Sequence, residues 1–258
     1  MNYKLNIDQR GVATVSLNRP ELHNAFNDAL ITDLIKCFRE LENNNSVRVV
    51  VLTGEGKSFC AGADLNWMKA MKDYSFEENV KDSQNLAELF QTINAFSRPV
   101  IGRINGHALG GGAGLVACCD YVLAVDTANI AFTEVRLGLI PAAISPFVIA
   151  KIGESHARAS FLSGAKINMS RAFVMGLVHQ VTTLERLDQD LEVVLADFLL
   201  AGPNAARSAK ELVREVVNAP TKEAVRDYTC SAIAKARASE EGQEGMSSLL
   251  EKRKASWY

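Results

Sequence analysis

Glycines gather in a stretch that could stabilise negative charge. Residues 104–115 read INGHALGGGAGL and lead into an apolar run, which indicates a tight turn feeding a helix. The first amides of a helix lack internal partners and carry positive potential, so they suit a developing anion. A second interpretation is that the glycines let the helix pack closely on a strand. The spacing matches neither a phosphate-binding loop nor a dinucleotide fingerprint.

A second small-residue segment, Ala61-Gly62-Ala63-Asp64, occupies a similar place in the chain. Both segments come after predicted buried strands, and ligands of open parallel sheets bind beyond the carboxyl ends of the strands. Two backbone N–H groups that converge on one oxygen form an oxyanion hole, which lowers the barrier of reactions through an enolate or a tetrahedral oxyanion.

The elements that must position these segments follow from hydrophobic periodicity. The pattern predicts a β-hairpin at 3–7 and 13–17, helices at 26–41 and 75–96, and strands at 47–52, 99–104, 121–125 and 130–132. Asn27 is a candidate helix cap, and Ser75 with Glu78 forms a capping-box pattern. Alternating strands and helices predict an α/β fold with a parallel sheet layered with helices.

The last third of the chain is helical in pattern. Apolar periodicity predicts helices at 184–200, 208–217, 221–236 and 245–254, with breaks at Gly202-Pro203 and Ala219-Pro220. We therefore expect an α/β core over 1–195 and a C-terminal helical region over 196–258. Such a region either packs on its own core or mediates oligomer contacts.

Composition excludes several functional classes. The chain has 258 residues, 48% of them hydrophobic, and a net charge of −2, which argues against a nucleic-acid or anionic-membrane partner. No apolar run is long enough to cross a bilayer. The five cysteines are irregularly spaced and read as reduced thiols, which predicts a cytoplasmic protein. No C-x-x-C or H-x-x-x-H pair is present, so no metal site is expected.

Four motifs in order resemble the crotonase (enoyl-CoA hydratase/isomerase) superfamily. They are Phe59-Cys60-Ala61-Gly62-Ala63-Asp64-Leu65, Asn105-Gly106-His107-Ala108-Leu109-Gly110-Gly111-Gly112, Cys119-Asp120, and Glu134-Val135-Arg136-Leu137-Gly138-Leu139-Ile140-Pro141. The resemblance implies repeated ββα units and a C-terminal trimerisation region, assembled as a homo-trimer or as a hexamer of two trimers. It also implies an acyl-CoA thioester substrate, and no separate cofactor, since coenzyme A is part of that substrate.

The resemblance assigns roles to particular residues. The oxyanion amides would be those of Ala63 and Gly111, and Glu134 would be the acid/base. Family hydratases commonly add a second glutamate in the helix after the glycines, but that position is Gly114 here. A lone carboxylate suffices for a 1,3-proton shift. It also serves a hydratase if it activates the water while another group positions it.

The expected substrate-binding residues extend along several segments. They are His23, Ala25, Ala61, Gly62, Asp64, Leu65, Trp67, Met68, Gly110, Gly114, Ser145 and Lys252, the last placed on the final helix and reaching the nucleotide of a neighbouring subunit. Four of them have a structural alternative: Asp64 caps a helix, Ser145 shapes a turn before Pro146, and Trp67 and Met68 belong to a lid or core. Glu134 itself would otherwise be a solvated loop carboxylate.

A narrower resemblance concerns substrate. Residues 63–69 and 134–146 are similar to bacterial methylglutaconyl-CoA hydratases of leucine and isoprenoid breakdown. The sequence thus predicts syn addition of water to a short or branched 2-enoyl-CoA. The alternative is a Δ3,Δ2-enoyl-CoA isomerase that uses Glu134 as its single proton shuttle. RNA binding and a non-catalytic scaffold are further alternatives, and the acidic composition and the retained Glu134 argue against them.

Overall fold

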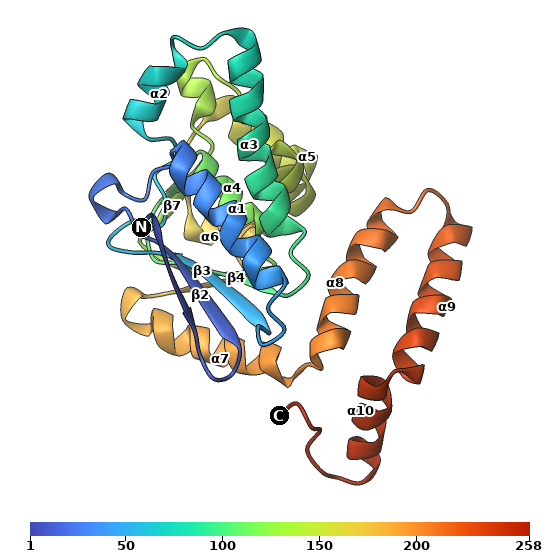
Figure 1. Ribbon diagram of the computed structural model, residues 1–258. Helices are drawn as coiled ribbons and strands as arrows, with labels where there is room; N and C mark the ends of the chain where they lie inside the picture. Colours follow the sequence, from blue (N-terminus) through green and yellow to red (C-terminus); the bar gives the residue numbers. More distant parts are fainter. The chain divides into compact units, whose positions relative to one another are not determined.

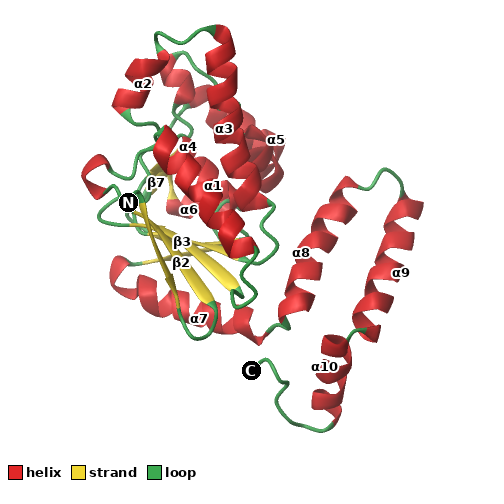
Figure 2. Ribbon diagram, in the orientation of Figure 1, coloured by secondary structure: helices red, strands yellow, loops and turns green.

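The computed structural model describes residues 1–258 as two compact units. The larger unit comprises residues 1–96 and 100–191, and the smaller comprises residues 97–99 and 192–258. All strands lie in the larger unit, whereas the smaller one is built from helices (Figures 1 and 2).

The main sheet of the larger unit has six strands in the order β1-β2-β3-β4-β6-β9. These are β1 (Tyr3–Ile7), β2 (Val12–Leu17), β3 (Val49–Gly54), β4 (Val100–Ile104), β6 (Tyr121–Val125) and β9 (Gln180–Thr182). β1 and β2 form the predicted antiparallel hairpin, and every other pairing is parallel. All six residues of β3 are buried, as expected for a strand of a sheet that is covered on both faces. The predicted layered α/β fold is confirmed.

A second sheet of three short strands carries the glycine stretch. It pairs β5 (Ala108–Leu109) with β7 (Asn129–Ala131) in parallel, and β7 with β8 (Ile167–Asn168) in antiparallel orientation. β5 ends directly before Gly110, and β7 ends three residues before Glu134. The pairing of β5 with β7 therefore brings the glycine stretch and the segment of Glu134 to one end of this sheet.

Two predicted helix starts are confirmed with their caps. Asn27 accepts a hydrogen bond from the amide of Leu30 at the start of α1 (Asp28–Glu42). Ser75 and Glu78 form a reciprocal capping box at the start of α3 (Phe76–Asn94). α1 and α3 pack on each other, and α4 (Gly111–Cys118) packs against α3. Figure 1 shows α1 lying across the strands with α3 beside it.

The sequence pattern missed several elements of the larger unit. They are α2 (Leu65–Met71), α5 (Ser145–Ser163), α6 (Met169–Val174), β5, β8, β9 and the 3-10 turns η1 (Pro20–Leu22) and η2 (Glu134–Leu137). The helix predicted at 184–200 begins with the 3-10 turn η3 (Leu184–Arg186). α5 escapes periodicity because Gly153, with a φ of 72° and a ψ of 164°, breaks it in the middle. The apolar residues on either side of that break therefore do not share one helical repeat.

The boundaries of the last helices differ from the predicted ones, although α7 ends at the predicted residue. α7 (Leu187–Leu200) is followed by α8 (Pro203–Asn218), α9 (Lys222–Ala238) and α10 (Glu240–Leu250). Pro203 starts α8 instead of breaking it, because proline is tolerated in the first turn. α10 begins at a cap formed by Ser239 and ends before Lys252, so the placement of Lys252 on the last helix is wrong. Lys252 has a φ of 54°, and the amide of Arg253 donates to the carbonyl of Ser248. Together these features form a Schellman-type turn that ends α10.

Candidate active site

The two glycine-bearing segments lie side by side in the larger unit. The amide of Cys60 donates to the carbonyl of His107 at 3.1 Å, and the amide of Leu109 donates to the carbonyl of Cys60 at 2.9 Å. Gly62 has a φ of +92°, and a Cβ at that position would stand 2.9 Å from the carbonyl oxygen of Leu109. Only glycine fits both the backbone angle and this approach, so the close contact of the two segments depends on Gly62.

Each segment presents a backbone N–H group without an acceptor in the chain. The amide of Phe26 donates to the carbonyl of Gly62, and the amide of Asp64 donates to the carbonyl of Phe26. The amide of Ala63, the residue between Gly62 and Asp64, donates to no group of the protein. Gly111 is the first residue of α4, so its amide has no intrahelical acceptor either. Ala63 is exposed and Gly111 half-buried. Both amides are therefore available to an acceptor from outside the chain.

Glu134 lies next to the glycine stretch. A Cβ on Gly110 would stand 3.5 Å from Oε1 of Glu134, and the φ of 50° and ψ of −122° at Gly110 strongly favour glycine. Oε2 of Glu134 is buried and accepts no hydrogen bond. Burial raises the pKa of this carboxyl above its ordinary value of 4.5. A carboxylate with one unpartnered oxygen and a raised pKa is suited to accept and return a proton.

Apolar side chains pack beneath the glycines. A Cβ on Gly111 would stand 2.8 Å from the ring of Phe26, and a Cβ on Gly114 would stand 2.9 Å from the ring of Phe90. The rings of Phe26 and Phe90 meet edge to face with their centroids 6.3 Å apart. Ile144 also occupies the space beside Gly114. α4 therefore brings no second carboxylate to the position where the family resemblance implies one.

The two segments that are expected to line the coenzyme A moiety lie next to each other. The amide of Ala61 donates to the carbonyl of His23 at 3.0 Å, and the imidazole Nδ1 of His23 lies 3.0 Å from the hydroxyl of Ser58. Ala25 is buried, and His23 is exposed. The turn at His23 and the segment after β3 therefore form one continuous edge beside the glycine stretch.

Asp64 has a structural role in this site. Its carboxylate accepts from the amide of Asn66 as the cap of α2, and it pairs with the guanidinium of Arg19 at 2.7 Å, with both side chains nearly buried. The hydrogen bonds from Arg19 and from backbone amides outweigh the effect of burial and lower the pKa of Asp64. This agrees with the alternative in which Asp64 caps a helix. The periodicity of the sequence did not indicate α2 or the ion pair.

The remaining expected binding residues occupy different environments. On α2, Leu65 is exposed, Trp67 is buried and Met68 is half-buried. The hydroxyl of Ser145 donates to the carbonyl of Ala142 at 2.9 Å and so takes part in the turn that leads into α5. Lys252 belongs to the smaller unit. Ile144 and Phe90 were not among the expected site residues, because no local pattern relates them to Gly114.

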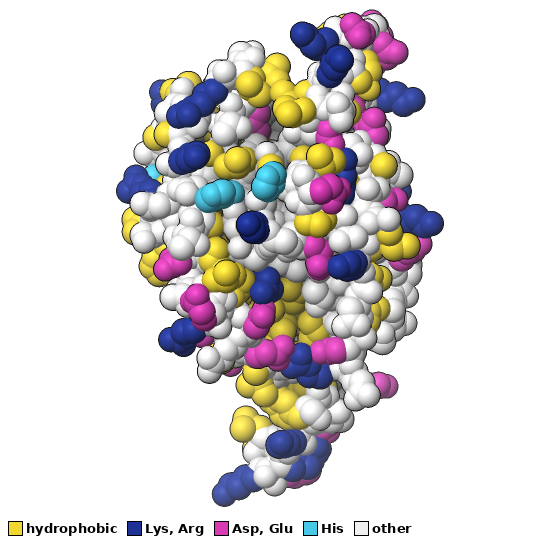
Figure 3. All heavy atoms as spheres, turned by 90° about the vertical axis from the view of Figure 1, so that its left-hand side faces the viewer, with side chains coloured by type: hydrophobic (Ala, Val, Ile, Leu, Met, Phe, Trp, Pro, Cys, Tyr) yellow, Lys and Arg dark blue, Asp and Glu magenta, His cyan; other side chains and the backbone are white.

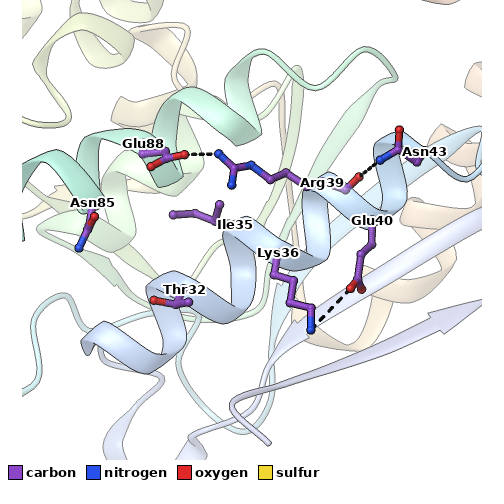
Figure 4. A pocket seen from close by; sticks show the side chains of 8 residues that line it. All are labelled: Thr32, Ile35, Lys36, Arg39, Glu40, Asn43, Asn85 and Glu88. Carbon is purple, nitrogen blue, oxygen red and sulfur yellow. Dashed lines mark hydrogen bonds and ion pairs between the residues drawn. The ribbon is translucent and has the colours of Figure 1, made fainter.

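Two cavities lie away from Glu134 and its neighbours. One of about 370 Å³ lies between α1 and α3, where Arg39 pairs with Glu88 and Lys36 pairs with Glu40 (Figure 4). The other, of about 460 Å³, is lined by Arg103, which pairs with Asp188 at 2.6 Å. Their cations are already neutralised, so neither cavity presents an uncompensated binding charge.

Other features of the structure bear on the alternative functions. No group of three or more His, Cys, Asp or Glu side chains is arranged to hold a metal ion. None of the helices is both apolar and long enough to span a lipid bilayer. On the face drawn in Figure 3, basic and acidic side chains are interspersed and form no broad basic stripe of the kind that binds nucleic acid.

Comparison with known proteins agrees with the fold and the motifs. An enoyl-CoA hydratase of Alternaria alternata is 37% identical over 217 residues, which cover 83% of this chain and 70% of that protein. A crotonyl-CoA hydratase of Syntrophomonas wolfei is 30% identical over 95% of this chain and 94% of its own. The crystal structure of an enoyl-CoA hydratase from Shewanella pealeana matches with a TM-score of 0.95 at 33% identity, covering 100% of this chain and 96% of the other.

The family assignment rests on nearly the whole length of the chain. The pattern that describes the enoyl-CoA hydratase/isomerase family matches residues 8–258, which include both glycine-bearing segments, Glu134 and the C-terminal helices. The protein belongs to the enoyl-CoA hydratase/isomerase family, the crotonase superfamily, and is an enzyme of that family.

Proposed function

We propose that the protein hydrates a 2-enoyl-CoA thioester and that Glu134 is the acid/base. The observation that carries this proposal is the buried Oε2 of Glu134, which has no hydrogen-bond partner and lies beside the glycine stretch. An oxygen without a partner in the protein can bind an attacking water. The relatives named as hydratases support the same reaction class.

The amides of Ala63 and Gly111 are the proposed oxyanion hole. They donate to the thioester oxygen, on which negative charge develops when a nucleophile attacks the conjugated double bond. Glu134 accepts a proton from water as the water oxygen bonds to C3. The resulting enolate then takes that proton from Glu134 at C2, on the same face, so water adds in the syn sense and Glu134 is regenerated. Coenzyme A is part of the substrate, and no separate cofactor is required.

The apolar floor of the site favours a short or branched hydrocarbon chain. Phe26 and Phe90 are buried beneath the glycines, and Trp67 of α2 is the proposed side wall. Methylglutaconyl-CoA is one candidate substrate, because residues 63–69 and 134–146 resemble methylglutaconyl-CoA hydratases. With this substrate the enzyme would take part in leucine breakdown. The distal carboxylate of methylglutaconyl-CoA calls for a cation or several donors at the far end of the acyl chain, which makes it a demanding test substrate.

Assembly and location complete the proposal. The exposed apolar side chains of the smaller unit, among them Val217, Leu249 and Leu250, support a trimer or a hexamer of two trimers. In such an assembly we propose that Lys252 contacts the nucleotide of coenzyme A bound to a neighbouring subunit. A cytoplasmic location remains part of the same proposal.

Isomerisation of a 3-enoyl-CoA to a 2-enoyl-CoA is the second candidate. It is favoured by Gly114, which carries no carboxyl group, and by Ile144, which fills the adjoining space. One base can remove a proton from C2 and return it to C4, so this reaction needs no second acid. The unpartnered Oε2 of Glu134 fits both reactions, so an assay with both kinds of substrate decides between them.

The test is a side-by-side assay with matched substrates. Purified protein is offered 2-enoyl-CoA and 3-enoyl-CoA thioesters of equal chain length, and the conjugated enoyl-thioester absorbance is followed. A hydratase makes the band of the first substrate disappear, and an isomerase makes a band appear with the second. Glu134→Gln should lower either rate by about 10²–10⁴-fold. Wild-type rates in Glu134→Gln, or no reaction with any enoyl-CoA, would contradict the proposal.

A further inference from the structure

Trp67 links the short helix α2 to α3. Its indole Nε1 donates to Oδ1 of Asp82 at 3.3 Å, and the side chain is buried with 7% of its surface exposed. α2 has only seven residues, too few to be stable without tertiary contacts. It is fixed at its start by the pair of Asp64 with Arg19 and at its third residue by the bond of Trp67 to Asp82.

Asp82 also contacts a second carboxyl group. Asp28, in the first turn of α1, lies close enough to Asp82 of α3 for the two carboxyl groups to interact. Partial burial and the charge of Asp28 raise the pKa of Asp82 to about 6, while the bond from Trp67 opposes this shift. Two neighbouring carboxyl groups repel each other when both are ionised, so the interaction between Asp28 and Asp82 depends on whether one of them carries a proton.

The groups around this pair add no compensating cation. Tyr74, in the turn between α2 and α3, has its pKa raised by burial and by the charges of Asp28, Asp82 and Glu78. Glu78 lies one turn before Asp82 on α3. The groups that act on the ionisation of Asp82 and Tyr74 are therefore carboxylates and an indole, and none of them is a cation, although Lys69 of α2 and Lys81 of α3 lie on the same elements.

We propose that Asp82 is a positioning residue, which holds Trp67 and with it α2 and the adjoining Ala63 segment, and that Asp28 makes this hold dependent on protonation. When Asp82 is ionised, it accepts a charge-assisted bond from the indole and repels Asp28. When it is protonated, this repulsion is relieved and it binds the indole less strongly. The catalytic consequence rests on the proposed function, because Ala63 supplies the proposed oxyanion amide. The hydrogen bond between Trp67 and Asp82 does not depend on the proposed function.

Tryptophan fluorescence tests the link without any substrate. The chain has two tryptophans, so Trp257→Phe, in the smaller unit, leaves Trp67 as the only one. In this parent we expect the emission to titrate with a midpoint near pH 6. Asp82→Asn should abolish the transition, and Asp28→Asn should lower its midpoint toward the ordinary Asp value of 3.8. Asp73→Asn, an exposed carboxyl in the same turn, is the matched control and should leave the midpoint unchanged.

Kinetics then test the consequence for the site. Asp82→Asn retains an oxygen that accepts the indole hydrogen bond, so its KM at pH 7 should stay near that of the parent. Asp82→Leu removes the acceptor and should raise KM for the enoyl-CoA about tenfold, with kcat less affected. If Asp82→Leu does not fold, Asp82→Ala removes the acceptor with a smaller side chain and should have the same effect on KM.

The outcomes separate the two proposals. A parent without a fluorescence transition, or a transition that persists in Asp82→Asn, overturns the link between Trp67 and Asp82. Equal KM values in Asp82→Asn and in the variant that lacks the acceptor overturn the role of Asp82 in positioning. A parent that shows the fluorescence transition and no reaction with any enoyl-CoA contradicts the proposed function and leaves the link supported.

Discussion

Ile144 fills the space into which a side chain at position 114 would point. An ideal Cβ on Gly114 lies well inside van der Waals contact of Cγ2 of Ile144, and it also stands 2.9 Å from the ring of Phe90. Ile144 and Phe90 are both buried, with 2% and 0% of their surfaces exposed. Gly114 is thus required by packing, and α4 carries no carboxylate beside Glu134, whose Oε1 would stand 3.5 Å from a Cβ on Gly110.

Gly114→Ala should therefore destabilise the protein. Overpacking of a filled core costs about 1–3 kcal/mol, because the neighbours must leave their preferred rotamers. Ile144→Ala alone should also destabilise, by leaving a cavity, but the double variant should be more stable than the sum of the two effects predicts. The measurement is the free energy of unfolding in denaturant for all four proteins of the cycle. Strict additivity would show that the two residues do not compete for space.

Glu134→Gln should raise thermal stability at neutral pH while it removes activity. The folded-state pKa of Glu134 is raised by burial, so the folded protein binds this proton more tightly than the unfolded chain does. Its contribution to stability is therefore present at low pH and is lost as pH rises through the folded pKa. Glutamine does not ionise and avoids this loss. The gain in Tm should be seen at pH 8 and vanish well below the ordinary value of 4.5.

A surface glutamate provides the control for that measurement. Glu21 is exposed and lies in the short turn η1. Glu21→Gln should change Tm little at either pH, since surface substitutions away from specific contacts are usually within about 0.5 kcal/mol. Equal Tm changes in the two variants would mean that the Glu134 carboxyl is not desolvated in the folded protein.

As pH is lowered, the activity of the wild-type enzyme should decrease at a higher pH than ionisation of an ordinary glutamate would cause. Glu134 must be ionised to accept a proton, and burial places its pKa above the ordinary 4.5. The acid limb of kcat/KM should therefore have its midpoint above that value. A profile of kcat/KM against pH, measured with a substrate that does not titrate in this range, checks the expectation. A midpoint at or below 4.5 would assign the limb to a solvated carboxyl group.

Asp64→Asn separates the helix cap from the ion pair. Asparagine is as good a cap as aspartate, so the start of α2 should be retained. Arg19, however, loses its partner at 2.7 Å, and breaking a buried pair from one side costs about 3 kcal/mol. Unfolding in urea should show this loss. Because the pKa of Asp64 is lowered, the wild-type advantage should be present above the ordinary value of 3.8 and disappear as pH falls through the folded pKa.

A second substitution identifies the source of that loss. Arg19→Met in the Asp64→Asn background removes the unpaired charge, so the double variant should recover part of the stability. If the double variant is no more stable than Asp64→Asn, the loss comes from the cap and not from the unpaired guanidinium.

Local patterns predicted much of the fold. The alternation around Asp8-Gln9-Arg10-Gly11 predicted the hairpin, and Asn27 and Ser75 predicted two helix starts, because capping and strand alternation depend on neighbours within a few residues. The glycine stretch, the small-residue segment after β3 and Glu134 identified the family, whose pattern matches residues 8–258. The helix boundaries after Gly202 were less accurate, because Pro203 can begin a helix as well as end one.

The sequence by itself determined the layered fold class, the family and the small set of residues able to do the chemistry. Only the tertiary structure decided their surroundings: the unpartnered Oε2 of Glu134, the packing of Ile144 beside Gly114 and the contact of Trp67 with Asp82. The reason is physical. Hydrophobic periodicity and caps act between residues close in sequence, whereas desolvation and steric exclusion depend on side chains that folding brings together from distant parts of the chain.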